Sequence, residues 1–299
     1  MKNSLSSWQK IIGEPTLSKA LENAKLVEVY DRNDVTVELY SQVDQQGRNQ
    51  RIMMAIPKNL DKPAPAVVIP FYFPEGMLGF NPKTNESIER YRHLDMMMHL
   101  VNRGYITISA DAFYLTYTDS EDPKKEENPW LMAANLIYSE NPSWTGVGRL
   151  ISDTKLLVDL LVSDSRVDGE RIGIAGHSLG GKMAFYTGCF DDRIKVIVAS
   201  DFGFKWEQTN WNDPWYYGDK VETLKSLGME HSQLLEIAQK PFCLIAGQYD
   251  DDSSLEAIRK AKGYETDEKL LFINHASGHY PTEDAINKGY DFIDKYLKG

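Results

Sequence analysis

The sequence predicts an α/β fold with a mostly parallel central sheet, helices on both faces of that sheet, and an antiparallel edge near the N-terminus. Two observations predict it. Between residues 26 and 56, three alternating apolar segments are separated by polar turn sequences, which is typical of antiparallel strands. From residue 66 onward, short and nearly continuous apolar runs alternate with helical stretches, as expected for parallel strands that are covered on both faces.

The expected elements follow one another without a linker, so we predict a single domain over residues 1–299. After the antiparallel strands, the expected elements are a strand at 66–73, a helix at 86–103 stopped by Gly104, a strand at 105–111, a helix at 148–164, a strand at 171–176, a helix at 179–189, strands at 194–200, 242–247 and 269–274, and a helix at 282–297. Segments 111–147 and 201–240 are longer than ordinary connections, and we expect lid-like excursions over one end of the sheet.

The composition excludes several classes of protein. The formal net charge is 33 − 44 = −11, and the Lys124-Lys125 pair is followed at once by two glutamates, so a nucleic-acid partner is not expected. No apolar run approaches the ~18 residues of a membrane-spanning helix, and the start lacks the apolar block of a secretory signal. Two cysteines cannot form a disulfide framework, and we expect both to be buried. We therefore predict a cytoplasmic protein without a membrane partner.

The strongest local motif is Gly176-His177-Ser178-Leu179-Gly180, between a predicted strand and a predicted helix. A serine exposed on such a sharp turn needs glycine neighbours, and the amide after it can bind an oxyanion at the helix N-terminus. This predicts Ser178 as a nucleophile and Leu179 as an oxyanion donor. Residues 176–182 also match the start of a phosphate-binding loop, but Met183 stands where that loop needs Ser or Thr. Lys182 is therefore expected on a solvated helix face.

A nucleophilic serine needs a base and an acid that orients the base. Asp250 follows the predicted strand 242–247, and His279 follows the strand 269–274, so both lie where parallel strands end and sites form. Asp251 and Asp201 remain alternatives for the acid, and His275 for the base. His275 and His279 have a spacing that zinc sites use, but no cysteine pair or third histidine lies near them, so we expect no metal.

From about residue 63 to 299, the chain resembles the α/β-hydrolase superfamily, most closely the esterases related to dienelactone hydrolase and acetyl xylan esterase. The resemblance rests on GHSLGG at 176–181, DDRIK at 191–195, NWNDPWYYG at 210–218, GQYD at 247–250 and SGHYP at 277–281. It implies an α/β-hydrolase fold and a triad in the order serine, acid, histidine, carried over to Ser178, Asp250 and His279.

This sequence departs from those relatives at two places. Dienelactone hydrolases have a cysteine at the position of Ser178. Many esterases have His-Gly where this chain reads Phe71-Tyr72-Phe73-Pro74. Because Pro74 has no amide hydrogen, the Phe73 amide is the expected second oxyanion donor.

We therefore expect a serine carboxylesterase that cleaves small esters, acetylated sugars among them, without metal or organic cofactor. The expected substrate-binding residues are Tyr72, His177, Trp211 and Trp215. The aromatic residues between 206 and 217 have two open interpretations, since they can line a substrate cleft or pin a lid to the core. Two other functions stay open: an amidase or peptidase with the same triad, and a binding protein of this fold without catalysis.

Overall fold

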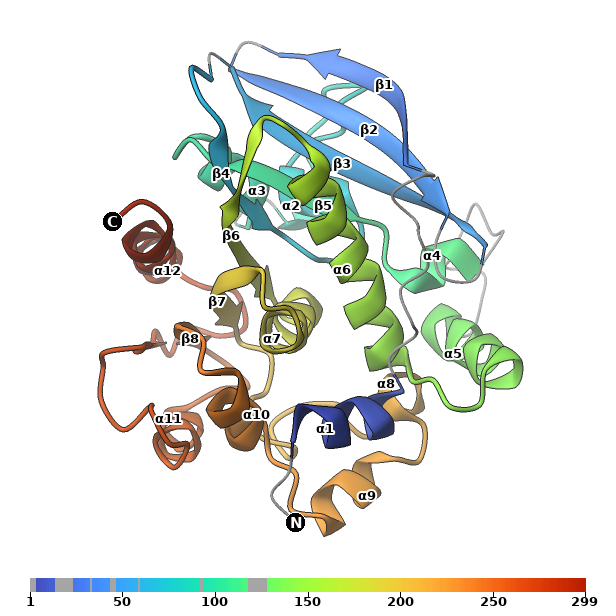
Figure 1. The fold of residues 1–299 in the computed structure, drawn as a ribbon, viewed down its shortest axis with the longest axis vertical. Helices are drawn as coiled ribbons and strands as arrows, with labels where there is room; N and C mark the ends of the chain where they lie inside the picture. The colour runs from blue at the N-terminus through green and yellow to red at the C-terminus, as the bar shows by residue number, and fades with distance from the viewer. Residues whose placement is uncertain are drawn as a thin grey trace.

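A central sheet organises the computed structural model, which describes residues 4–13, 24–32, 34–43, 47–58, 60–91, 94–117 and 128–299 (Figure 1). Its strands in the described residues are β1 (Lys25–Asp31), β2 (Val35–Val43), β3 (Asn49–Pro57), β4 (Ala64–Val68), β5 (Ile106–Ala110), β6 (Val167–His177), β7 (Ile194–Ser200), β8 (Phe242–Ala246) and β9 (Leu270–Asn274). They are ordered β1-β2-β3-β5-β4-β6-β7-β8-β9. The pairs from β1 to β5 are antiparallel and those from β5 to β9 are parallel, which confirms the predicted sheet.

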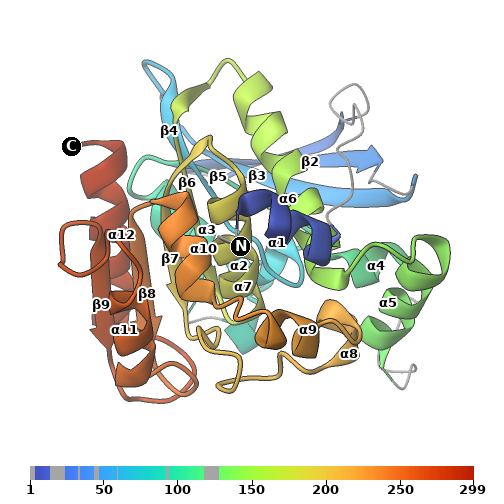
Figure 2. The same ribbon diagram turned by 60° about the horizontal axis from the view of Figure 1, so that its bottom comes forward.

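Helices cover both faces of the sheet, as predicted (Figures 1 and 2). One face carries α1 (Leu5–Ile12), α6 (Gly146–Ser163) and α7 (Leu179–Phe190), and the other carries α2 (Pro74–Leu78), α3 (Met96–Val101) and α12 (Glu283–Leu297). Adjacent strand residues point to opposite faces, so Met54 joins the first buried cluster and Met53 the second. The apolar runs of the sequence are therefore explained by burial on both sides.

The predicted helix over 86–103 is wrong in its first half. The structure has a short 3₁₀ helix, η2 (Glu89–Tyr91), and α3 begins only at Met96. Before η2, the Asn81 side chain accepts hydrogen bonds from the amides of Lys83 and Thr84, and Phe80 bridges to Ser87. The amide of Ile88 also donates to the carbonyl of Gly79, so the first residues of the predicted helix are paired with the chain before them and not within a helical turn.

The two predicted excursions contain short helices that lie together at one end of the molecule (Figure 2). The first holds α4 (Phe113–Tyr117) and α5 (Pro129–Glu140), and its residues 118–127, with Lys124-Lys125, lie outside the described residues. The second holds α8 (Pro214–Tyr217), α9 (Val221–Ser226) and α10 (His231–Ala238), and α11 (Asp252–Arg259) follows β8. Cys189 and Cys243 are buried free thiols, as expected. Within the described ranges, no helix combines the length and apolarity needed to cross a bilayer.

Candidate active site

Ser178 lies on a strained turn between β6 and α7. Its backbone has φ 57° and ψ −117°, a left-handed conformation that non-glycine residues rarely adopt. A Cβ atom on Gly176 would lie 2.1 Å from the carbonyl oxygen of Gly180, and one on Gly180 would lie 2.2 Å from that of Pro70. The two glycines are therefore required by close backbone approach, and they permit the turn that presents Ser178 to the neighbouring pocket.

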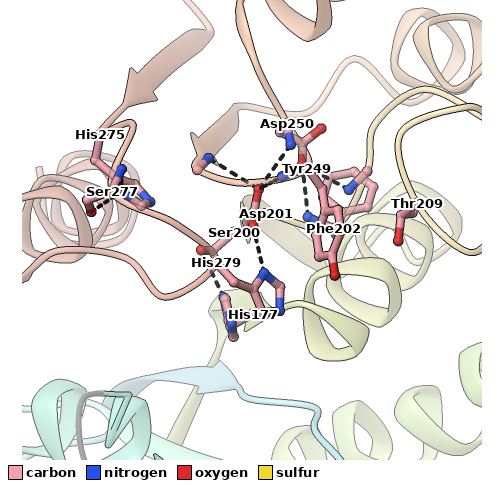
Figure 3. Close-up of polar contacts among 12 residues, drawn as sticks. His177, Ser200, Asp201, Phe202, Thr209, Tyr249, Asp250, His275, Ser277 and His279 are labelled. Atoms are coloured by element: carbon pink, nitrogen blue, oxygen red, sulfur yellow. Dashed lines mark hydrogen bonds and ion pairs between the residues drawn. The ribbon is translucent and has the colours of Figure 1, made fainter.

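His279 is paired with Asp201 and not with Asp250, the acid expected from the sequence. His279 Nδ1 lies 2.6 Å from Asp201 Oδ2, and Asp201 is fully buried (Figure 3). The other carboxylate oxygen, Oδ1, accepts hydrogen bonds from the amides of Gly247, Tyr249 and Asp250 at 3.2, 2.8 and 2.9 Å. Burial acts to raise the pKa of Asp201, but the hydrogen bonds from His279 and from these amides hold it below its usual value. Asp201 is therefore a fixed carboxylate aimed at one nitrogen of His279.

Asp250 also has a defined place, but it faces the backbone instead of His279. Its Oδ2 accepts from the amides of Phe202 and Gly203 at 2.8 and 2.9 Å, and its Oδ1 from the amide of Phe204 at 2.6 Å and the hydroxyl of Ser254 at 3.1 Å. The Asp201 side chain thus accepts from amides of the loop after β8, and the Asp250 side chain accepts from amides of the loop after β7, so each aspartate fixes the loop of the other. Burial raises the pKa of Asp250 to about 6, against these hydrogen bonds.

The two remaining alternatives from the sequence are placed elsewhere. Asp251 caps α11 through its side chain, which accepts a hydrogen bond from the Ser253 amide, and it does not contact His279. His275 Nδ1 lies 2.8 Å from the hydroxyl of Ser277. Among the described residues, no group of three His, Cys, Asp or Glu side chains is placed to hold a metal ion.

Ser178 and His279 line one pocket of about 800 Å³. Both excursions contribute to its wall, with Trp130 from α5 and Trp215 from α8, whose ring centroids are 4.8 Å apart. Tyr72 lies on the same wall, 5.7 Å from the Trp130 ring. The aromatic residues between 206 and 217 therefore do both things that the sequence left open: some line the substrate pocket, and others pack in the core. Trp130 was missed because its excursion lacks a recognisable motif.

Phe73, Tyr72, His177 and Trp215 line this pocket, as their predicted roles require, whereas Trp211 does not. Trp211 is fully buried and its indole nitrogen donates a hydrogen bond of 2.7 Å to the carbonyl of Gly203. It supports the loop after Asp201 and has no exposed surface for a ligand, so the prediction for Trp211 is wrong.

His177 packs its ring at 4.4 Å from the ring of His279, with Nδ1 3.1 Å from the Ser200 hydroxyl. Burial lowers the pKa of His177 to about 3, so its imidazole is neutral.

Lys182 corrects a second expectation. It is on α7, one turn after Ser178, but it is buried and lines the pocket instead of facing solvent. Arg90 of η2 lines the pocket as well and carried no sequence signal. The place of Lys182 could have been predicted from the sequence, because it follows Ser178 by four residues and this spacing puts two side chains on one face of a helix.

Two protein-family models match the chain. The family model described as Acetyl xylan esterase (AXE1) matches residues 5–207. The chain belongs to the acetyl xylan esterase family. A second model, the prolyl oligopeptidase family, matches residues 148–299, the part that carries Ser178, Asp201 and His279. The expected α/β-hydrolase fold and the assignment as a serine ester hydrolase are confirmed.

Individual relatives are more distant. The protein YtaP of Bacillus subtilis (strain 168), a hydrolase by name, is 28% identical over 256 residues, which are 81% of this chain and 81% of YtaP. A glucuronoyl esterase from Solibacter usitatus superposes with a TM-score of 0.72 at 15% identity, covering 99% of this chain and 95% of that one. An acetyl xylan esterase from Paenibacillus sp. R4 has a TM-score of 0.62 at 14% identity, covering 99% and 100%. These two structures share the fold of the esterase described here.

Proposed function

We propose that this esterase is a serine carboxylesterase in which Ser178 is the nucleophile, His279 the general base and Asp201 the acid that orients it. The observation that carries the proposal is the 2.6 Å contact between His279 Nδ1 and Asp201 Oδ2, beside the strained turn of Ser178. An Nδ1 proton donated to a carboxylate leaves Nε2 of the imidazole free to accept a proton, which is the tautomer a general base needs.

In the proposed reaction, Ser178 Oγ attacks the ester carbonyl while His279 takes its proton. The amide of Leu179, the first residue of α7, has no partner within its helix and is available to the oxyanion, and the Phe73 amide is the second donor because Pro74 has none. The tetrahedral intermediate expels the alcohol, which takes its proton from His279. Water then attacks the acyl-enzyme with His279 again as base, and the acid is released.

For the substrate, we infer short acyl esters, acetyl above all, on a sugar or a similar small alcohol. The family membership supports an acetyl group. The exposed parts of Trp130, Trp215 and Tyr72 supply aromatic surface on one wall of the pocket, and such surface suits the apolar face of a sugar ring. A pocket of about 800 Å³ has room for such a ring together with its acyl group.

A fluorophosphonate probe tests the nucleophile. We expect covalent labelling of the natural protein and no labelling of Ser178→Ala, with Ser163→Ala as a matched control, because Ser163 ends α6 away from the pocket. Labelling of the Ser178→Ala variant at the natural rate would remove Ser178 from the mechanism. No labelling of the natural protein, together with no hydrolysis of aryl acetates, would favour a binding protein without catalysis.

Cleavage of amide bonds is a second candidate, favoured by the match of residues 148–299 to the prolyl oligopeptidase family. A panel of aryl esters with acyl chains of about two to ten carbons, acetylated sugars and chromogenic peptides separates the two. We expect the acetyl esters to have the highest kcat/KM. A preference for acyl chains of about eight carbons or more, or peptide cleavage faster than ester cleavage, would contradict the proposal.

A further inference from the structure

In the described part of the chain, the pocket beside Ser178 is lined by two basic side chains and no carboxylate, in a protein that is strongly acidic. The formal net charge of the chain is −11, yet the described residues that line the pocket include Arg90 and Lys182 and no Asp or Glu. Of the two histidines on the wall, His177 is neutral because of its burial. A basic lining where the substrate is bound favours a substrate that carries a negative group near the ester.

Arg90 is exposed at this pocket, with its guanidinium 5.3 Å from the centre of the Tyr91 ring. In the part of the chain that the structure describes, no carboxylate lies within ion-pair distance of it. Burial raises the pKa of Tyr72 and Tyr91, and in both cases the positive charge of Arg90 opposes that effect. The cation therefore acts on the tyrosines that form the pocket wall, and its own charge is not neutralised by a neighbour.

Lys182 is held rigidly on the pocket floor. Its ammonium lies 4.3 Å from the ring centres of both Trp211 and Tyr216, and donates to Asn210 Oδ1 at 2.8 Å and to the Tyr216 hydroxyl at 3.1 Å. Asp213 is bonded to Asn210 and not to Lys182. An ammonium has three donor hydrogens, and two of them have the partners named here, so one remains.

The two cations belong to one binding surface that Tyr72 connects. Ring contacts run from Tyr72 through Phe71 to Tyr91, beside Arg90. In the other direction they run through Trp130 and Trp215 to Tyr216, which binds Lys182. All of these side chains line the same pocket as Ser178. A substrate bound in this pocket therefore meets a surface that carries both basic side chains and Ser178.

Building on the proposed esterase function, we propose that the natural substrate is an acetylated acidic sugar, whose carboxylate is bound by Arg90 and Lys182 while Ser178 attacks the acetyl group. A carboxylate matches the single exposed guanidinium, which can bind both oxygens at once. The acidic surface of the protein opposes long polyanions, so the fitting substrate is a small saccharide with one negative charge. The carboxylate is a recognition group in this proposal and takes no part in bond breaking.

The test compares monoacetates of three sugars that differ at one position: methyl glucoside, methyl glucuronoside, and methyl glucoside 6-phosphate. We expect kcat/KM at low salt to be about tenfold higher for the glucuronoside than for the glucoside, as one partly exposed charge pair provides, and to converge as salt is raised. The ratio of two substrates on one preparation does not depend on how much of the protein is folded.

Matched variants then locate the effect. Arg90→Gln and Lys182→Met should each reduce the ratio several-fold, and Arg90→Lys should retain part of it. Arg171→Gln should leave the ratio unchanged, because Arg171 lies in the first half of β6, pairs with Asp168 and does not line the pocket. A ratio near one in the natural protein, or a ratio that survives Arg90→Gln, would overturn the inference.

A faster reaction with the phosphate than with the glucuronoside would overturn the choice of a carboxylate. The failure of the inference can be told from failure of the proposed function. If aryl acetates are hydrolysed and labelling needs Ser178, the esterase proposal stands whatever the sugar ratio is.

Discussion

Replacing Asp201 by asparagine should remove almost all activity while leaving the fold intact. Oδ1 of Asp201 accepts three amide hydrogen bonds, so in the Asp201→Asn variant the carbonyl oxygen of the new side chain has to keep that place. The NH₂ group then faces His279 Nδ1, which lies 2.6 Å from Oδ2 in the natural protein. To accept from it, His279 must carry its proton on Nε2, the nitrogen that has to receive the proton of Ser178.

The magnitude follows from this tautomer. The same exchange in a serine-protease triad costs about 10⁴-fold in kcat, so we expect a loss of about 10³–10⁴-fold in kcat/KM, or ~4–5.5 kcal/mol of transition-state stabilisation. Because the three amides keep their acceptor, the thermal midpoint should stay within a few degrees of the natural value.

Asp250→Asn should behave in the opposite way. Both oxygens of Asp250 accept from backbone amides, so an NH₂ group in either orientation faces a buried N–H. At least one amide loses its acceptor, which costs about 1–3 kcal/mol of folding stability and lowers the thermal midpoint by several degrees. The contact between His279 and Asp201 remains, so the loss of kcat/KM should be much smaller than in Asp201→Asn.

The assay measures kcat/KM for an aryl acetate, normalised to the folded fraction from circular dichroism, beside thermal unfolding. Asp251→Asn is the control, since asparagine also caps helices well and this residue does not contact His279. If Asp250→Asn loses more activity per folded site than Asp201→Asn, the acid is Asp250 and the interpretation of the His279 contact is wrong.

Three further predictions concern the pocket and its surroundings. Trp215→Ala should raise KM for acetylated sugars with a modest change in the thermal midpoint, because Trp215 lines the pocket. Trp211→Ala should cost about 3–5 kcal/mol of folding stability in denaturant unfolding, because its buried indole donates to the carbonyl of Gly203. The opposite pattern would place Trp211 at the ligand. Burial lowers the pKa of Lys182 to about 7, against the charges of Asp213 and Asp250, so its ammonium is present below that pH and lost above it. The ratio of kcat/KM for the acetylated glucuronoside to kcat/KM for the glucoside should therefore decrease as the pH is raised from about 6 to 8.5 in the natural protein. The ratio should stay level in Lys182→Met. A ratio that rises with pH would contradict the role of Lys182. A chelator should leave the rate of aryl acetate hydrolysis unchanged, and a loss that zinc restores would show that a metal ion takes part in the reaction, contrary to the proposed mechanism.

The sequence by itself determined the sheet, the turn of Ser178 and the placement of His279 after the last strand. These features depend on local patterns. Apolar runs and their spacing are enough to predict β6, β7 and α7 to within a few residues, since burial on both faces leaves little choice of structure. The glycines around Ser178 can be read because only glycine allows the backbone approaches at that turn. The prediction of a helix over 86–103 failed in its first half because Ser87 and Ile88 pair with Phe80 and Gly79 in the preceding segment.

Only the tertiary structure decided which aspartate meets His279, which tryptophan faces the pocket, and that Lys182 is buried in it. Asp201 and Asp250 end neighbouring parallel strands, so the chain order places both near His279, and the choice rests on which loop amides each carboxylate can reach. Trp211 and Trp215 are four residues apart on one excursion, but only the fold distinguishes them. The indole of Trp211 is fixed by a buried carbonyl, whereas Trp215 lines the cavity. Such choices depend on contacts between segments far apart in the chain, and the pattern of a single segment does not contain them.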